Sequence, residues 1–282
     1  MTSIRLLDRE TKEIFEEHPP AKNALVWLYR DNLISKIARF LIAYVPFLGW
    51  AYAQFQKTPL SKNSIAPFIE KYNVNRSEFL SENFSSFSDF FERRLKASAR
   101  PIDSDEKKLV SPADGRVKLI EEKTFDVKGK SFSLEKLVND TKLAKKFENG
   151  KILTVRLAPQ DYHRLHAPLD GRVLSVKKMR GPLFSVSPIA LKKNLSILHE
   201  NKRVILEFEN YAMVLVGATF VGTIHLKIKE EDEVKKGDEI GHFSFGGSMC
   251  VLLLKEGVSV EEDLHFPDGE VLIKMGQPIA SL

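Results

Sequence analysis

The amino-acid sequence predicts an α+β fold in which N-terminal membrane-associating helices precede a mostly antiparallel, β-rich core with few helices. Before residue 57 apolar side chains recur at helical spacing, whereas after residue 105 short Val-rich segments alternate with Gly and Asp-Gly turns. Short strands with few helices between them favour an antiparallel, mostly closed core over alternating βαβ units. With 282 residues, 43% of them hydrophobic, the chain can bury a sizeable core. A polar connection at 99–103 divides it into a helical region, 1–100, and a β-rich domain, 101–282.

The helical region contains an apolar run at 40–56 that has no charged residue. This run is at the short edge of a membrane span, and Pro46 and Gly49 interrupt it. Aromatic residues such as Trp50 are of the type that settles at the level of the lipid headgroups. We therefore expect two helices that meet near Pro46 and lie on a membrane rather than cross it. The alternative is a helical hairpin buried in a soluble protein.

The remaining N-terminal residues carry weaker signals. Residues 61–96 continue the helical pattern, with Asn75 as an N-cap and a short helix that starts at 85 and ends near Arg94. The opening eight residues lack the hydrophobic stretch of a signal peptide. A single cysteine, Cys250, excludes an internal disulfide and fits a reducing compartment.

The β-rich domain has Val-rich segments that predict strands, and one longer segment, 134–148, that predicts a helix. It shows no Gly-rich phosphate loop and no zinc-type spacing. The expected strands are 116–120, 152–157, 172–176, 204–208, 212–216 and 224–228.

Charge is unevenly placed along the chain. The net charge is +5, yet residues 170–203 alone hold eight Lys or Arg against Asp170 and Glu200. Such a stretch suits an anionic membrane surface or a phosphate-bearing ligand. A solvated face without function is the alternative.

Three polar clusters can carry chemistry. Ser-Pro-Ala-Asp-Gly at 111–115 contains Asp114, which is an ordinary turn residue unless a partner gives it a role. The segment 161–168 holds His163 and His166, without a nearby acidic or Cys partner that would complete a metal site. Imidazole suits general acid–base catalysis near neutral pH. Within the basic stretch, Ser185 and the neighbouring backbone N–H groups can hold an anion.

A Gly-Gly-Ser sequence interrupts the apolar run 243–254. Glycines in a strand interior usually mark a bulge or a close approach of two backbones. Alternatively, Ser248 is a nucleophile whose Oγ attacks the carbonyl of Gly247, which has no Cβ to shield it. These residues alone leave both interpretations open.

Taken together and in this order, the motifs resemble those of the bacterial phosphatidylserine decarboxylases, which are pyruvoyl-dependent enzymes made as proenzymes. The resemblance covers roughly residues 100–282. Here Met249 stands where that family usually has a second hydroxyl residue, which bears on the rate of self-cleavage rather than on its site. The motifs are at 111–115, 161–168, 181–186, 216–219, 221–224, 245–248 and 273–278.

The resemblance implies a role for each candidate residue. Asp114 would orient His166, and His166 would take the proton of Ser248 as it attacks Gly247, by the logic of a catalytic triad. Cleavage would convert Ser248 into an N-terminal pyruvoyl group, the only cofactor. His163 would protonate the carbanion left by decarboxylation, and Ser185 would bind the lipid phosphate.

The resemblance also implies the reaction and its setting. The pyruvoyl group would form a Schiff base with phosphatidylserine, and loss of CO₂ would give phosphatidylethanolamine. A β chain, 1–247, and an α chain, 248–282, would stay associated as a peripheral enzyme on the cytoplasmic side of the cell membrane. Neither a metal nor a nucleic acid is expected, and a homodimer is left open.

Two other functions compete with this one. The segment 234–243 is similar to the turn of biotinyl or lipoyl carrier domains and sugar-transport phosphocarrier domains, which would make the chain an uncleaved, non-enzymatic protein. No carrier-type motif surrounds a Lys or His there. A pyruvoyl enzyme acting on a soluble amino acid is the other competitor, and the apolar N-terminal helices argue against it.

Overall fold

The computed structural model describes residues 4–18, 21–120, 125–127, 130–219, 223–246 and 248–282. Ser248 is therefore described, whereas Gly247, the residue expected on the other side of the cleaved bond, lies outside the described residues.

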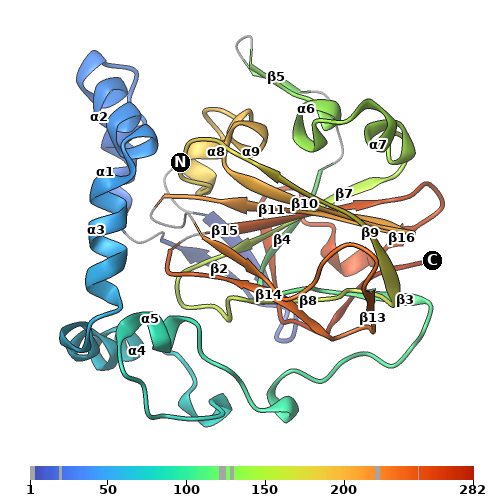
Figure 1. Cartoon of the computed structure of the whole chain (residues 1–282), viewed down its shortest axis with the longest axis horizontal. Helices are drawn as coiled ribbons and strands as arrows, with labels where there is room; N and C mark the ends of the chain where they lie inside the picture. Colours follow the sequence, from blue (N-terminus) through green and yellow to red (C-terminus); the bar gives the residue numbers. More distant parts are fainter. Residues whose placement is uncertain (1–3, 19–20, 121–124, 128–129, 220–222, 247) are drawn as a thin grey trace.

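A ten-stranded sheet forms the centre of the molecule (Figure 1). All neighbouring strands in it are antiparallel except β17 and β1, which run parallel. The prediction of a mostly antiparallel sheet is confirmed. In spatial order its strands are β13 (Glu233–Val234), β9 (Gly171–Met179), β10 (Arg203–Phe208), β11 (Tyr211–Gly217), β15 (Ser248–Leu254), β7 (Lys151–Leu157), β4 (Gly115–Ile120), β17 (Glu270–Ile273), β1 (Ile4–Asp8) and β2 (Ile14–Glu17).

Three smaller sheets accompany it. One consists of β12 (Ile224–Leu226), β14 (Glu239–Phe243) and β8 (Arg164–His166); another of β16 (Ser259–Val260), β18 (Pro278–Ser281) and β3 (Lys108–Val110); and the last of β5 (Phe125–Val127) and β6 (Lys130–Phe132).

Helices are few and short in the β-rich domain, as the sequence predicts. They are α6 (Leu134–Val138), α7 (Thr141–Lys146), α8 (Pro188–Leu191) and α9 (Ile197–Glu200). The N-terminal region contains α1 (Lys22–Leu28), α2 (Leu33–Tyr44), α3 (Pro46–Gln56), α4 (Ile65–Tyr72) and α5 (Phe87–Phe91). Short 3₁₀ turns cover Pro59–Ser64, Arg76–Glu78, Ala97–Ala99 and Glu262–Leu264.

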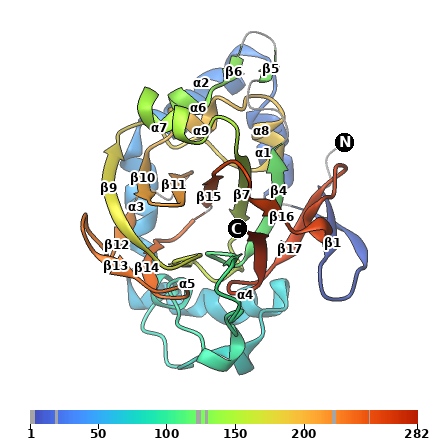
Figure 2. The same ribbon diagram turned by 90° about the vertical axis from the view of Figure 1, so that its right-hand side faces the viewer.

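The main sheet separates two hydrophobic cores, because successive side chains of a strand point to opposite faces. On β15, Met249, Val251 and Leu253 pack with α6–α9, whereas Cys250 and Leu252 face the core shared with β8, β14 and β18. A third, phenylalanine-rich core lies under α4 and α5. Figure 2 shows how strongly the main sheet curves around these cores.

The helices α1–α3 form a column along one side of the molecule, next to the ends of β11 and β15 (Figure 1). Helices α2 and α3 meet at Pro46, as predicted, since proline is favoured at the start of a helix and cannot continue one. Among the described residues no single helix is long and apolar enough to cross a membrane. The bent pair Leu33–Tyr44 and Gly49–Gln56 meets that criterion jointly, by length and composition, with an angle of 54° between the two.

Three expectations need correction. Residues 4–17 of the region expected to be helical form β1 and β2, which extend the main sheet through pairing with β17. The helix expected at 134–148 is two helices, because Asn139 adopts a left-handed conformation and Asp140 caps a new helix. Finally, the main sheet curves but remains open within the described residues, with β13 and β2 at its edges.

Candidate active site

Ser248 is the first residue of β15 and lies between two neighbouring strands of the main sheet. It is paired with Gly217 of β11 on one side and with Leu157 of β7 on the other. Its side chain is completely buried, and its Oγ has no hydrogen-bond partner among the described residues. Buried hydroxyl groups are nearly always hydrogen-bonded, and exceptions concentrate at sites of strain or catalysis.

The segment just before Ser248 is held by aromatic side chains from the helical region. Phe245 makes ring contacts with Tyr52 of α3 and with Phe87 and Phe91 of α5, at centroid distances of 5.6, 5.4 and 5.1 Å. The next residue, Gly246, has φ of 130°, a conformation that side chains with a Cβ rarely adopt. Helices α3 and α5 therefore pack against the segment that leads into Ser248.

His163 lies close to this segment. Its Nδ1 donates a hydrogen bond to the Asp161 carbonyl at 3.0 Å, which leaves the lone pair on Nε2. Nε2 is buried and has no partner among the described residues, while the Phe91 ring lies 3.9 Å from the imidazole ring. Burial lowers the pKa of His163 to about 3, an effect that the backbone carbonyls of Asp161 and Gly246 oppose. The imidazole is therefore neutral at physiological pH, with an unprotonated Nε2.

His166, at the end of β8, is hydrogen-bonded at both ring nitrogens. Nδ1 donates to the Gly237 carbonyl at 2.8 Å, and the hydroxyl of Tyr162 lies 3.3 Å from Nε2. Burial lowers the pKa of His166, whereas the Gly237 carbonyl and the charges of Glu239 and Asp114 favour protonation. The hydrogen bond to Gly237 keeps the proton on Nδ1, which leaves Nε2 free of a proton, as a general base requires. The Tyr162 hydroxyl is hydrogen-bonded to that Nε2.

Asp114 lies beside the strand that carries His166. The backbone N–H of His166 donates to the carbonyl of Pro112, two residues before Asp114. The carboxylate accepts hydrogen bonds from Arg100, at 2.6 to 3.0 Å, and from the backbone N–H of Met275 at 2.8 Å. Among the described residues no hydrogen bond joins Asp114 to His166, or His166 to Ser248. The structure brings the two motifs together, and Asp114 acts on His166 through its charge.

Ser185 lies in the loop 181–187, which is connected to the end of β11 by hydrogen bonds of the Asn201 side chain. The side chain of Asn201 donates to the carbonyls of Phe184 and Gly217, both at 2.8 Å, and accepts from the Phe184 N–H. Since Gly217 pairs with Ser248, the Asn201 side chain connects the Ser185 loop to the residue next to Ser248 in the sheet. The backbone N–H of Ser185 donates to the Tyr29 hydroxyl at 3.1 Å. The sequence did not single out Asn201 or Tyr29, and neither belongs to a motif.

A pair of histidines lies next to Ser244 and Phe245, and the sequence did not predict it. His225 of β12 and His242 of β14 are opposite one another and stack at 4.6 Å. Nε2 of His225 lies 2.9 Å from the Ser244 hydroxyl, and Nε2 of His242 lies 3.4 Å from the carboxylate of Glu92. The pairing register of β12 with β14 brings the two histidines opposite one another, and no sequence motif indicates that register.

Two buried groups, Ser248 Oγ and His163 Nε2, thus lack a hydrogen-bond partner among the described residues. The backbone N–H of Phe243 donates to the His163 carbonyl, so His163 is attached to the chain that leads into Ser248. No hydrogen bond among the described residues joins Asp114, His166 or Ser185 to the Ser248 side chain. A nucleophilic hydroxyl and a neutral imidazole are the groups that acyl transfer at a backbone carbonyl requires.

Comparison with known proteins gives a consistent result. The sequence profile of the phosphatidylserine decarboxylase family matches residues 87–281. A protein named phosphatidylserine decarboxylase proenzyme from Fusobacterium nucleatum is 42% identical over 273 residues, which covers 93% of this chain and 91% of that protein. Proteins of the same name from Clostridium beijerinckii and Chlamydia pneumoniae are 38% and 37% identical, covering 92% and 94% of this chain and 91% of each relative. The likeness thus extends into the helical region, and the chain belongs to the phosphatidylserine decarboxylase family.

Proposed function

We propose that this chain is the proenzyme of a phosphatidylserine decarboxylase, which releases CO₂ from phosphatidylserine and forms phosphatidylethanolamine. Membership of the family supports the reaction. The observation that carries the proposal for this chain is the buried Ser248, whose Oγ has no hydrogen-bond partner among the described residues; the ring of His163 lies close to Gly246, two residues earlier in the chain.

Ser248 activates the proenzyme by attacking its own chain. Its Oγ adds to the carbonyl of Gly247, the peptide bond breaks, and an ester joins the two residues until elimination releases the new N-terminus. His166 is the base for this attack, with its Nδ1–H fixed by Gly237, and Asp114 stabilises the imidazolium through its charge. For this step the hydrogen bond between His166 Nε2 and the Tyr162 hydroxyl must break, and the Ser248 hydroxyl must take its place as the partner of Nε2.

The surroundings of Ser248 fit the pyruvoyl group that the family name implies. Burial excludes water, and His163, whose ring lies close to Gly246, has an Nε2 without a hydrogen-bond partner among the described residues. When formed, this group supplies an electrophilic carbonyl that acts as an electron sink during decarboxylation. His163 passes a proton through Nε2 to the carbon that has lost CO₂, the role that the resemblance to the family implies for it.

The lipid reaches the site along the helical side of the molecule. Exposed apolar side chains cover α2 and α3, among them Leu33, Ile34 and Phe47, at 72%, 70% and 64% exposure. Such a face suits peripheral binding at the lipid interface, on the cytoplasmic side of the membrane. Because Tyr52 of α3 contacts Phe245, the same helix links the membrane face to the reacting segment. Ser185, on its anchored loop, then binds the lipid phosphate.

Conversion of phosphatidylserine to phosphatidylethanolamine by the purified protein, reconstituted in vesicles that contain phosphatidylserine, tests this function. We expect activity from the wild-type protein and none from Ser248→Ala, which folds with the same backbone but lacks the hydroxyl. Cleaved wild-type protein that releases no CO₂ from the lipid, yet decarboxylates a soluble amino acid, would contradict the assignment of substrate.

A further inference from the structure

A pocket of about 610 Å³ lies on the face of the main sheet opposite to the Ser248 side chain. Its floor is built by three neighbouring strands, through Lys118 of β4, Thr154 of β7 and Met249 of β15. Because side chains alternate along β15, Met249 points into this pocket while Ser248 points away from it. The volume is in the range of small-molecule sites, and the site is separate from the space next to Ser248.

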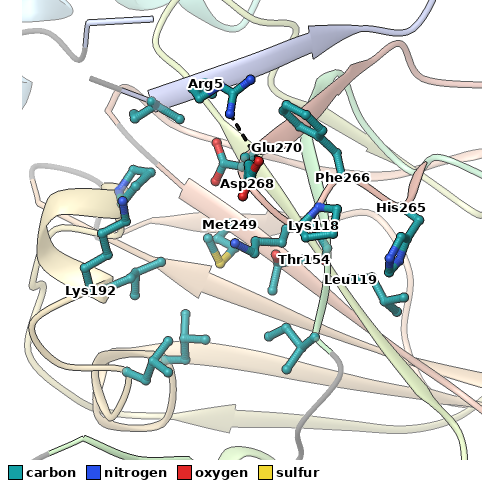
Figure 3. Close-up of a pocket in the computed structure, with 18 of the residues that line it drawn as sticks. Arg5, Lys118, Leu119, Thr154, Lys192, Met249, His265, Phe266, Asp268 and Glu270 are labelled. Atoms are coloured by element: carbon teal, nitrogen blue, oxygen red, sulfur yellow. Dashed lines mark hydrogen bonds and ion pairs between the residues drawn. The ribbon is translucent and has the colours of Figure 1, made fainter. Parts of the chain in front are cut away.

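Apolar side chains make most of the walls. Leu191, Leu195 and Leu198, from α8, α9 and the loop between them, form one wall. The opposite walls come from β4 and from the chain around Phe266 (Figure 3). A flexible hydrocarbon chain is the kind of ligand that such a lining accommodates without leaving polar groups unsatisfied.

Some charged side chains of the pocket form ion pairs, whereas two lysines among the described residues do not. Arg5 and Asp268 form an ion pair at 3.1 Å, and Glu270 pairs with Arg156, a buried residue opposite Met249 on the same face of the sheet. By contrast, the ammonium groups of Lys118 and Lys192 have no hydrogen-bond or ion-pair partner among the described residues. Figure 3 shows Lys118 crossing the floor beside Met249 and Lys192 projecting from the end of α8.

We propose that this pocket binds a single-chain anionic amphiphile. The anionic head, a carboxylate or a phosphate monoester, pairs with Lys118 and Lys192, and the hydrocarbon chain lies along the leucines and Met249. Among the described residues that line the pocket, Glu16 is the remaining acidic residue, and it is exposed like the two lysines, so two cations face the head for one anion. The proposal does not depend on the decarboxylase activity, because the ligand binds on the other face of β15.

Photolabelling tests the site directly. The full-length protein, embedded in phosphatidylcholine nanodiscs, is irradiated with palmitic acid that carries a diazirine at the end of its chain, and the labelled peptides are mapped by mass spectrometry. We expect label within 191–198 or on Met249. A palmityl alcohol probe with the same diazirine should label these positions far less, since it lacks the charge.

Paired variants decide whether the lysines bind the head. Lys118→Gln with Lys192→Gln should lower labelling of the pocket roughly tenfold, as expected when charge-assisted hydrogen bonds are lost. The matched control, Lys145→Gln with Lys178→Gln, removes the same charge from exposed lysines outside the pocket and should label normally.

Competition by unlabelled palmitate and by lysophosphatidate identifies the preferred head, and displacement by either one supports the proposal. Three results would overturn it: label confined to α2 and α3, equal labelling of the pocket by the acid and the alcohol, or equal labelling of the two double variants.

Discussion

At the scale of single residues, the two histidines of one motif have different surroundings although only two residues separate them. His163 is wholly buried and has a nitrogen without a partner, whereas both nitrogens of His166 are hydrogen-bonded. The sequence identified both imidazoles as candidates. It could not reveal their partners, because Gly237 lies far along the chain and the Tyr162 contact depends on how β8 ends.

Alanine substitutions should separate the roles of the two histidines. His166→Ala should leave an uncleaved chain, because Ser248 loses its base. His163→Ala should still cleave itself but decarboxylate about 10²–10⁴-fold more slowly, the usual contribution of positioned proton transfer. Denaturing gels report the cleavage, and CO₂ release reports the turnover.

Tyr162→Phe serves as the control for this pair. It removes the hydroxyl that occupies His166 Nε2 and should not slow cleavage, since it frees the nitrogen that the base must use. If His163→Ala blocks cleavage while His166→Ala permits it, the base is the unpartnered His163 and the two roles must be exchanged.

The buried His163 should also make the fold sensitive to acid. Its pKa is about 3 in the folded chain against 6.5 for an ordinary histidine, so below pH 6.5 the unfolded chain binds more protons at this residue. The free energy of unfolding should therefore fall with decreasing pH, by about 1.4 kcal/mol per pH unit between these values, and this effect is absent above pH 6.5.

Urea unfolding at pH 6.5 and pH 5, in the single-chain Ser248→Ala background, measures this effect. Adding His163→Gln should reduce the loss of stability between the two pH values by about 2 kcal/mol. The exposed His18, changed to Gln, is the matched control and should leave the loss unchanged. An identical pH dependence with and without His163 would show that the imidazole is accessible to protons in the folded chain.

At the scale of secondary-structure elements, local patterns predicted most strands because each is a short apolar run bounded by turn residues. The strands at 152–157, 204–208 and 212–216 are confirmed nearly residue for residue. The strand β1 was missed because it is stabilised by pairing with β17, more than 250 residues away, and a five-residue segment gives little periodic signal. The division of 134–148 into two helices depends on Asn139 and Asp140, whose capping signal is weaker than the helical pattern.

The exposed face of α2 and α3 should decide membrane binding. Replacing Ile34 and Phe47 by Glu should weaken binding to anionic vesicles at least about a hundredfold, since each large apolar side chain contributes about 1.5–3 kcal/mol when buried. Vesicle flotation measures the bound fraction. Ile14→Glu with Phe15→Glu, at two exposed apolar residues of β2, is the matched control and should float normally. Equal flotation of both double variants would mean that another surface holds the protein on the membrane.

At the scale of the whole molecule, the segment 248–282 is built into the centre of the fold. It supplies β15, which lies between β11 and β7, and also β17 and β18 of two different sheets. Sequence motifs predicted a cleavage site between 247 and 248 but not this strand order, which arises from pairings between distant segments. Because β15 is buried along its whole length, we expect the two chains to remain associated after cleavage.

Self-activation of the chain at Ser248 can be tested by the intact mass of the purified protein under denaturing conditions. We predict two chains, 1–247 and 248–282, which copurify before denaturation, and Ser248→Ala as one inactive chain. The shorter wild-type chain should be lighter than its encoded sequence by the mass of ammonia, because its first residue carries a ketone in place of an amine. An active wild-type protein that consists of one uncleaved chain with an unmodified Ser248 would contradict the account.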